Sequence, residues 1–312
     1  DVAVVPSGMA AIAAVLLPLL HPGDRALLPA DGYGPTRALA AEHLTPRGVH
    51  VDLVATQGLA HADLSGYDLV LVETPSNPGL RVADLADVAA RAHANGRRDG
   101  AGALVVVDNT LLTPLGQRPL ELGADVVVAS DTKAVNGHTD ALGGHVASRD
   151  PQVMARVRGW RTLAGGILGT HEAWLIHRGL ETLEVRFARM CASAQAVAEL
   201  AAGHPAVRAV VYPGLADHPD AEVVARQMTA AGGLVGLRFA DAAAAERFIA
   251  AAQYVVPQTS FGGTHTAAER RARWGDDVPD GFVRLSVGVE PTAELLADLE
   301  RAMTAAGGGP TA

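Results

Sequence analysis

Short apolar runs recur along the first half of the chain at intervals that suit an α/β protein. Each run is short enough for a strand and shows little alternation of polar and apolar positions. Such strands are covered on both faces, as in a mostly parallel sheet with helices on either side. The predicted strands are 2–5, 25–29, 50–54, 68–72, 103–107 and 125–128, and the clearest helices are an alanine-rich one ending near Leu20 and 82–94.

Beyond Pro151 the pattern changes to one typical of an α+β domain. A long helical pattern at 172–202 predicts a single connecting helix. We therefore expect a large α/β domain at 1–180 and a smaller α+β domain at 181–312. The smaller domain is predicted to hold strands 207–211, 234–239 and 283–287, helices ending near Ala231, at 242–252 and from Thr292, and a polar loop at 257–274.

Polar clusters follow three successive predicted strands, each at the point where the strand ends. The carboxyl ends of parallel strands meet at one edge of a sheet, where α/β proteins place their ligands. Delivery of polar residues to that edge by three strands favours an enzyme. The clusters are Glu73-Thr74-Pro75-Ser76-Asn77-Pro78, Asp108-Asn109-Thr110 and Ser130-Asp131-Thr132-Lys133.

Three charged residues in or beside apolar strands are candidates for chemistry. Lys133 is either a surface lysine in a polar turn or an amine that captures an aldehyde. Asp108 either caps a turn or faces a cationic ring nitrogen. Arg284 lies inside an apolar strand and needs a partner, which is either a substrate carboxylate or a structural ion pair with Glu290 or Asp276.

Two glycine-containing turns are candidates for ligand contacts. The turn Ser7-Gly8-Met9 lies between a strand and a helix, where unpaired helix amides can bind a phosphate, although a plain tight turn fits equally well. Tyr33 lies between two glycines and is followed by a proline, so it occupies a rigid loop. It packs either locally or against a planar cofactor.

Composition excludes several classes of function. A net charge of −9 argues against a nucleic-acid partner. The single cysteine, Cys191, excludes a disulfide framework and fits a cytoplasmic protein. No apolar run is long enough to cross a bilayer, and no histidines or cysteines have the spacing of a metal site.

Motifs that contain these residues resemble the Cys/Met-metabolism family of enzymes that use pyridoxal 5'-phosphate (PLP), the trans-sulfuration enzymes. The resemblance implies the PLP-dependent transferase fold of type I, like that of aspartate aminotransferase. The motifs occur in the family order over nearly the whole chain. They are Ser7 to Ala11, Tyr33-Gly34, Glu73 to Pro78, Asp108 to Thr110, Ser130 to His138 with Asp140, Arg178 to Leu183, Tyr212 to Leu215, Ser260 to Gly263 and Arg284 to Gly288.

The resemblance also implies a role for each candidate residue. Lys133 is the lysine that forms an imine with PLP, Asp108 pairs with the ring nitrogen, and Tyr33 stacks on the ring and is a candidate acid or base. The predicted cofactor site is completed by Ser7, Gly8, Met9, Asn77, Thr110, Ser130 and Thr132, and the predicted substrate contacts are Asn77, Ser260 and Arg284.

The implied chemistry begins with exchange of the substrate amine for Lys133 and removal of the α-proton by the freed lysine. Pro35 stands where methionine γ-lyases carry a cysteine, and the loop with His265-Thr266 resembles that of bacterial cystathionine γ-lyases. The predicted activity is therefore cleavage of the Cγ–S bond of L-cystathionine to cysteine, 2-oxobutanoate and ammonia.

Other activities share the same cofactor residues and stay open. They are γ-replacement by a cystathionine γ-synthase or an O-acyl-homoserine sulfhydrylase, cleavage by a cystathionine β-lyase, and a scaffold of the same fold without cofactor. The resemblance implies a homotetramer of two active-site dimers. It also implies an N-terminal arm with a Tyr-x-Arg pair that reaches the neighbouring subunit, and we expect this arm to precede residue 1.

Overall fold

A computed structural model describes residues 1–94 and 102–308. The last four residues of the predicted smaller domain, 309–312, lie outside the described residues. The larger sheet contains β1 (Val2–Val5), β2 (Arg25–Pro29), β3 (His50–Val54), β4 (Leu69–Glu73), β5 (Leu104–Asp108), β6 (Val126–Ala129) and β7 (Gly144–Ser148). The smaller sheet contains β8 (Ala209–Val211), β9 (Leu234–Arg238), β10 (Val256–Pro257), β11 (Ala267–Arg270) and β12 (Phe282–Ser286).

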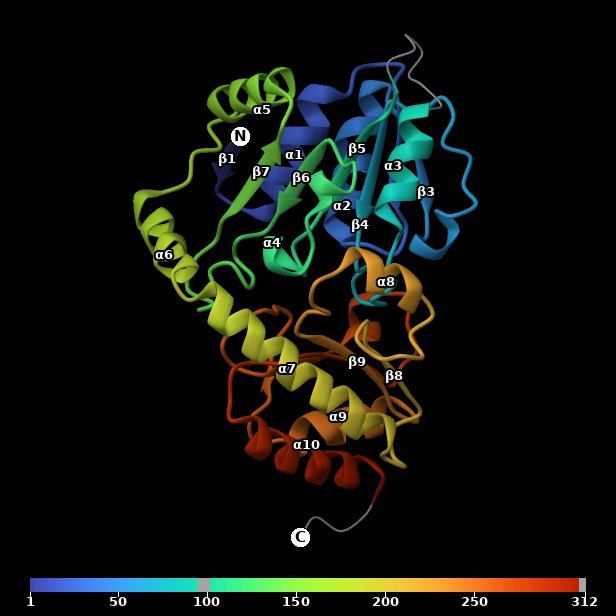
Figure 1. The fold of residues 1–312 in the computed structure, drawn as a ribbon, viewed down its shortest axis with the longest axis vertical. Helices are drawn as coiled ribbons and strands as arrows, with labels where there is room; N and C mark the ends of the chain where they lie inside the picture. The colour runs from blue at the N-terminus through green and yellow to red at the C-terminus, as the bar shows by residue number, and fades with distance from the viewer. Residues whose placement is uncertain (95–101, 309–312) are drawn as a thin grey trace.

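The helices divide between the two sheets (Figure 1). The first set is α1 (Gly8–Leu19), α2 (Gly34–Leu39), α3 (Leu85–Ala94), α4 (Thr113–Gly116), α5 (Pro151–Leu163) and α6 (Thr170–Leu180). The second set is α7 (Leu183–Ala202), α8 (Ala221–Gln227), α9 (Ala242–Ala251) and α10 (Thr292–Ala306). Short helices of other types are Ala40–Leu44, Thr45–Arg47, Thr56–Gly58, Pro119–Glu121 and η5 (Arg271–Trp274).

The seven strands of the larger sheet run in the order β1-β7-β6-β5-β4-β2-β3. All are parallel except β7, which is antiparallel to both of its neighbours. Along β4, Leu69 and Leu71 face the core covered by α1 and α5, whereas Val70 and Val72 face the core covered by α3. This two-sided burial explains the continuous apolar runs and confirms a mostly parallel sheet with helices on both faces.

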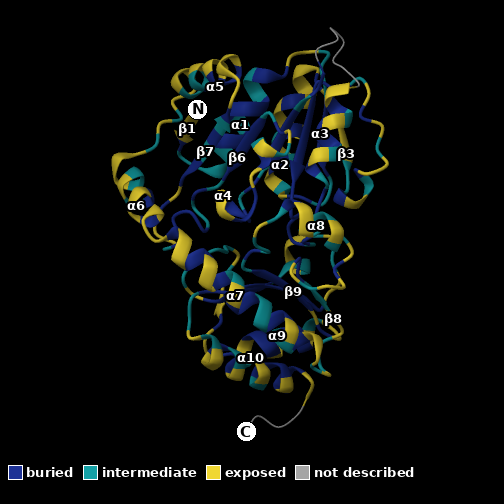
Figure 2. Cartoon of the chain, viewed as in Figure 1, coloured by how far each residue is buried: buried dark blue, intermediate teal, exposed yellow. Residues whose placement is uncertain are grey.

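The smaller sheet is covered on one face by α7, α9 and α10. Val283 and Leu285 of β12 belong to that core. Because side chains alternate along a strand, Arg284 points to the opposite face, toward the larger sheet. Figure 2 shows buried residues along the strands and exposed residues on the outward sides of α5 and α10.

The predicted single helix at 172–202 is wrong, because the chain turns between α6 and α7 at Glu181 and Thr182. The carbonyl of Gly179 would accept the amide of residue 183 in a continuous helix. It accepts instead from the Thr182 amide at 3.3 Å and the Arg186 guanidinium at 2.7 Å. We propose the domain boundary here, between residues 180 and 181.

The polar loop predicted at 257–274 is also wrong, since β11 and η5 lie within it. Ala267 and Ala268 are buried and pair with β12. The charged residues beside them make this strand look like a polar loop in the sequence. In addition, β8 begins two residues later than predicted, and α8 ends at Gln227 rather than near Ala231.

Candidate active site

A cavity of about 350 Å³ lies where the carboxyl ends of β4, β5 and β6 face the smaller sheet. Every residue predicted for the site lines this cavity. They are Ser7, Gly8, Met9, Tyr33, Asn77, Asp108, Thr110, Ser130, Thr132, Lys133, Ser260 and Arg284. The volume lies in the range of pockets that enclose small ligands.

Lys133 is the only lysine in the sequence. All other side chains that are cationic at neutral pH belong to arginines. Its Nζ donates to Ser260 Oγ at 2.9 Å and lies 4.8 Å from the centre of the Phe261 ring. Burial, helped by the positive charges of Arg284 and Arg271, lowers the pKa of Lys133 to about 8. A neutral amine near physiological pH is the form that attacks an aldehyde.

The turn that carries Lys133 is held from the far side by Arg186 of α7. This buried guanidinium donates to the carbonyls of Ala134 at 2.8 Å and Val135 at 3.2 Å. Gly262 packs so closely that an added Cβ would lie 2.7 Å from the amide of Ala134. The lysine therefore enters the cavity from a turn that two residues of the smaller domain, Arg186 and Gly262, hold in place.

Asp108 ends β5 and accepts two hydrogen bonds from Thr110, one from the amide at 3.0 Å and one from the hydroxyl. Burial raises the pKa of Asp108, although the bonds from Thr110 and the nearby His145 act in the opposite direction. A cationic ring nitrogen beside this buried carboxylate would compensate the cost of its charge. Asp108 therefore also caps the turn that follows β5, as one of its two predicted roles requires, and it does so through Thr110. The Asn109 side chain takes no part and bonds to Thr113 and Gln117.

The N-terminus of α1 forms a cradle that fits a phosphate. Ser7 Oγ caps the Ala10 amide at 3.0 Å, whereas no acceptor within the described ranges is recorded for the amides of Gly8 and Met9. A Cβ on Gly8 would lie 2.6 Å from Ser130 Cβ, so only glycine lets the helix start approach Ser130. Free amides at a helix N-terminus bind anions well.

The hydroxyl of Thr132 is already engaged with Gly143, whose amide donates to it at 3.1 Å and whose carbonyl accepts from it at 3.3 Å. Thr110 likewise accepts the amide of Ser130 at 2.9 Å through its hydroxyl. Both threonines therefore also hold the walls of the cavity together.

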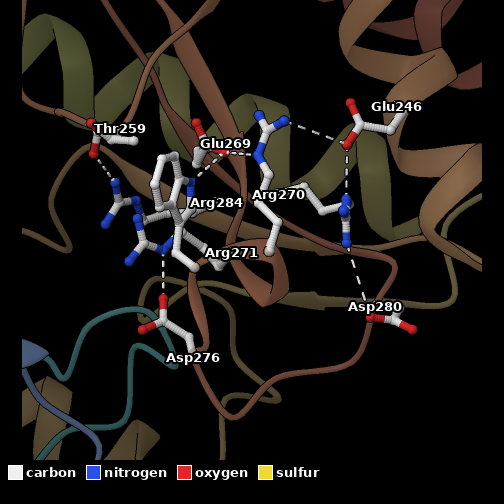
Figure 3. A network of polar contacts seen from close by, with 10 residues as sticks. Glu246, Thr259, Glu269, Arg270, Arg271, Asp276, Asp280 and Arg284 are labelled. Carbon is white, nitrogen blue, oxygen red and sulfur yellow. Dashed lines mark hydrogen bonds and ion pairs between the residues drawn. The ribbon is translucent and has the colours of Figure 1, made fainter.

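Arg284 is buried and approaches the cavity from the smaller sheet. Its Nη1 donates to Asn77 Oδ1 at 2.6 Å and its Nη2 donates to the carbonyl of Thr259 (Figure 3). Among the described residues no ion pair is recorded for Arg284, so the structural pair with Glu290 or Asp276 is wrong. Burial and the charge of Arg271 lower the pKa of Arg284 to about 10, and a bound carboxylate would offset that cost.

Tyr33 lies at the mouth of the cavity with 43% of its surface exposed. Its amide donates to Glu73 Oε2 at 2.6 Å. The loop is therefore tied to the end of β4.

Glu73 was not predicted as a site residue, although it ends β4 as Asp108 ends β5. The two are paired in register and both line the cavity. Burial and the neighbouring charge of Asp108 raise the pKa of Glu73 well above its ordinary value. The position of Glu73 at the end of a predicted strand is the sequence feature that could have identified it as a site residue. The other cavity-lining residues that were not predicted are Ile12, Pro75, Leu111, Leu142, Thr259, Phe261 and Arg271.

Taken together, the cradle, the amine and the buried carboxyl fit PLP. Over 1–94 and 102–308, no group of His, Cys, Asp or Glu side chains is arranged to hold a metal ion. Within the same ranges, no helix is long and apolar enough to cross a membrane.

The comparisons with known proteins agree with this geometry. Residues 1–304 match the family described as Cys/Met metabolism PLP-dependent enzyme. A "Putative cystathionine gamma-lyase" of Streptomyces coelicolor is 49% identical over 299 residues, which span 95% of this chain and 74% of that protein. An L-methionine gamma-lyase of Pseudomonas deceptionensis is 40% identical over 317 residues, which span 96% of this chain and 78% of that protein. Other relatives are named cystathionine gamma-synthase and cystathionine beta-lyase.

A solved structure shares the fold over almost the whole chain. It is cystathionine gamma synthase from Xanthomonas oryzae pv. oryzae in complex with aminoacrylate and cysteine, with a TM-score of 0.92 and 34% identity. The alignment covers 99% of this chain and 82% of that one. These matches confirm the predicted family, fold and dependence on PLP. The chain belongs to the Cys/Met-metabolism family of PLP-dependent enzymes.

Proposed function

We propose that this enzyme cleaves the Cγ–S bond of L-cystathionine, with water, to give cysteine, 2-oxobutanoate and ammonia. The observation that carries the PLP-dependent part of the proposal is the convergence of Lys133, Asp108 and Arg284 on one cavity. The 49% identity to the Streptomyces coelicolor protein supports the choice of γ-cleavage. Methionine γ-lyases resemble one another in carrying a cysteine at the position of Pro35. The proline argues against cleavage of methionine by this enzyme.

When bound, PLP supplies an electron sink for the carbon atoms of the substrate. Lys133 would hold the cofactor and then carry protons, a role suited to an amine with a pKa lowered to about 8. Arg284, with Asn77 and Ser260 beside it, would bind the α-carboxylate. Asp108 would keep the ring nitrogen cationic.

The remaining roles follow from position. The amides of Gly8 and Met9 with Ser130 would hold the phosphate, and Thr132 and Thr110 would support that cradle. Tyr33, at the mouth of the cavity, would exchange a proton with the departing sulfur. Ser7 would act through the helix cap that it forms.

Incubation of the PLP-loaded protein with L-cystathionine tests the proposal. We expect cysteine and 2-oxobutanoate in equal amounts from the wild type, and none from Lys133→Arg, which keeps the charge but cannot form an imine. Homocysteine with pyruvate would identify β-cleavage instead. Formation of cystathionine from O-succinyl-L-homoserine and cysteine, without cleavage, would identify a γ-synthase.

We also propose that the enzyme is a homo-oligomer, namely the homotetramer that the family resemblance implies. Large apolar side chains are exposed along the segment from the end of α5 to the start of α7. Leu163 is 89% exposed, Ile167 and Trp174 60% and Val185 68%. Surfaces of this kind mark protein contacts, and sedimentation velocity measures the assembly directly.

A further inference from the structure

A second guanidinium, that of Arg271, lines the same cavity as Arg284 and Lys133. It begins η5, directly after β11, in the segment that the sequence predicted as a polar loop. No role in the chemistry described above uses it.

Arg271 is fixed by one ion pair. Its Nε donates to Asp276 Oδ2 at 2.6 Å (Figure 3). The side chains of Arg271 and Asp276 are 14% and 17% exposed. Within the part of the chain that the structure describes, neither Nη1 nor Nη2 of Arg271 has a hydrogen-bond partner in the protein. Neither nitrogen is fully buried either, since the fully buried polar atoms that lack a partner belong to other residues. These two nitrogens are therefore available to a ligand in the cavity.

The neighbouring arginines are used differently. Arg270 pairs with Glu246 and Asp280 (Figure 3). Arg273 pairs with Glu269 and Glu246. Neither of them lines the cavity. Arg271 is thus the member of this basic segment that faces the ligand space.

The electrostatics of the cavity favour a second anion. The charge of Arg271 disfavours the charged forms of both Arg284 and Lys133. An α-carboxylate bound by Arg284 would leave the terminal nitrogens of Arg271 without an acceptor, because Asp276 pairs only with Nε. A second carboxylate would pair with them in the forked geometry that guanidinium favours.

We propose that Arg271 binds a distal carboxylate of the substrate, so that the enzyme prefers γ-substituted amino acids that carry an anion beyond the leaving atom. This inference rests on the proposed function and names its substrate class. L-Cystathionine has such a carboxylate, whereas L-methionine and O-acetyl-L-homoserine do not. Arg271 would therefore determine specificity and take no part in proton transfer.

Calorimetry with two unreactive probes tests the inference without turnover. Suberate has a carboxylate at each end of a chain as long as the carbon–sulfur backbone of cystathionine, and octanoate has only one. We expect the PLP-loaded wild type to bind suberate at least about 10-fold more tightly than octanoate, and Arg271→Gln to lose that preference. Arg271→Lys should keep part of it, and Arg273→Gln, the matched control, all of it.

Kinetics and cofactor binding complete the test. Arg271→Gln should lower kcat/KM for L-cystathionine about 10- to 100-fold, mainly through KM, and leave O-acetyl-L-homoserine and the PLP dissociation constant unchanged. Equal losses for both substrates, weaker PLP binding or an unchanged suberate preference would overturn the inference. A suberate preference that depends on Arg271, in an enzyme that does not cleave cystathionine, would leave the inference standing and remove only the proposed function.

Discussion

At the scale of the residue, the buried amine of Lys133 dictates a pH dependence. Its pKa is lowered from 10.5 to about 8, chiefly by burial. In the PLP-free protein, labelling of Lys133 by trinitrobenzenesulfonate should therefore rise with a midpoint near pH 8. Peptide mass spectrometry across a pH series measures this, and unfolding in urea should move the midpoint to about 10.4. A midpoint near 10.4 in the folded protein would show that the amine is solvated.

The same shift affects stability. Because the folded pKa lies below the unfolded one, the folded state binds fewer protons between about pH 8 and pH 10.5. The contribution of this amine to the free energy of unfolding of the PLP-free protein therefore rises with pH across that window.

Individual site residues differ in how well the sequence predicts them. Lys133, Asp108 and Arg284 could be predicted because each lies in or just after an apolar strand. Arg271 could not, because its position depends on the pairing of β11 with β12, whereas the local sequence is as polar as a loop. Glu73 stands between these cases, since its strand was predicted but its pairing with Asp108 needs the register of the sheet.

At the scale of the element, the start of α1 governs the phosphate cradle. Gly8→Ala would place a Cβ 2.6 Å from Ser130 Cβ and push the helix start away from that strand end. We expect PLP to bind about 10- to 100-fold more weakly, since hydrogen bonds to a charged phosphate are lengthened. Fluorescence titration of the PLP-free protein measures the dissociation constant.

The matched control for this substitution is Gly159→Ala in α5, because nothing lies within 4 Å of its added Cβ. This variant should bind PLP like the wild type and should be slightly more stable. Equal PLP affinity of the Gly8 and Gly159 variants would contradict the cradle.

The elements themselves were predicted where local pattern decides the structure. The buried parallel strands have continuous apolar runs, so their ends were predicted to within about a residue. The strand β7 was not predicted, because His145 and Ser148 interrupt its apolar pattern. The break between α6 and α7 depends on Arg186, which contacts the Lys133 turn from a distant part of the sequence.

At the scale of the whole molecule, the site exists only where the two sheets meet. Arg284 of the smaller sheet bonds to Asn77 after β4, a contact between residues 207 positions apart. A second link joins Arg81 to Asp220 through hydrogen bonds of 2.7 Å to both carboxylate oxygens. Local sequence patterns do not report such contacts. The motifs could therefore indicate which residues form the site, but not how the two sheets bring them together.

Borohydride reduction of the PLP-loaded protein, followed by peptide mapping, tests directly whether Lys133 forms the imine with PLP. We expect one phosphopyridoxyl group on the peptide that contains Lys133, the only lysine in the sequence, and none after reduction of Lys133→Arg. PLP that remains bound after reduction without any modification of that peptide would contradict it.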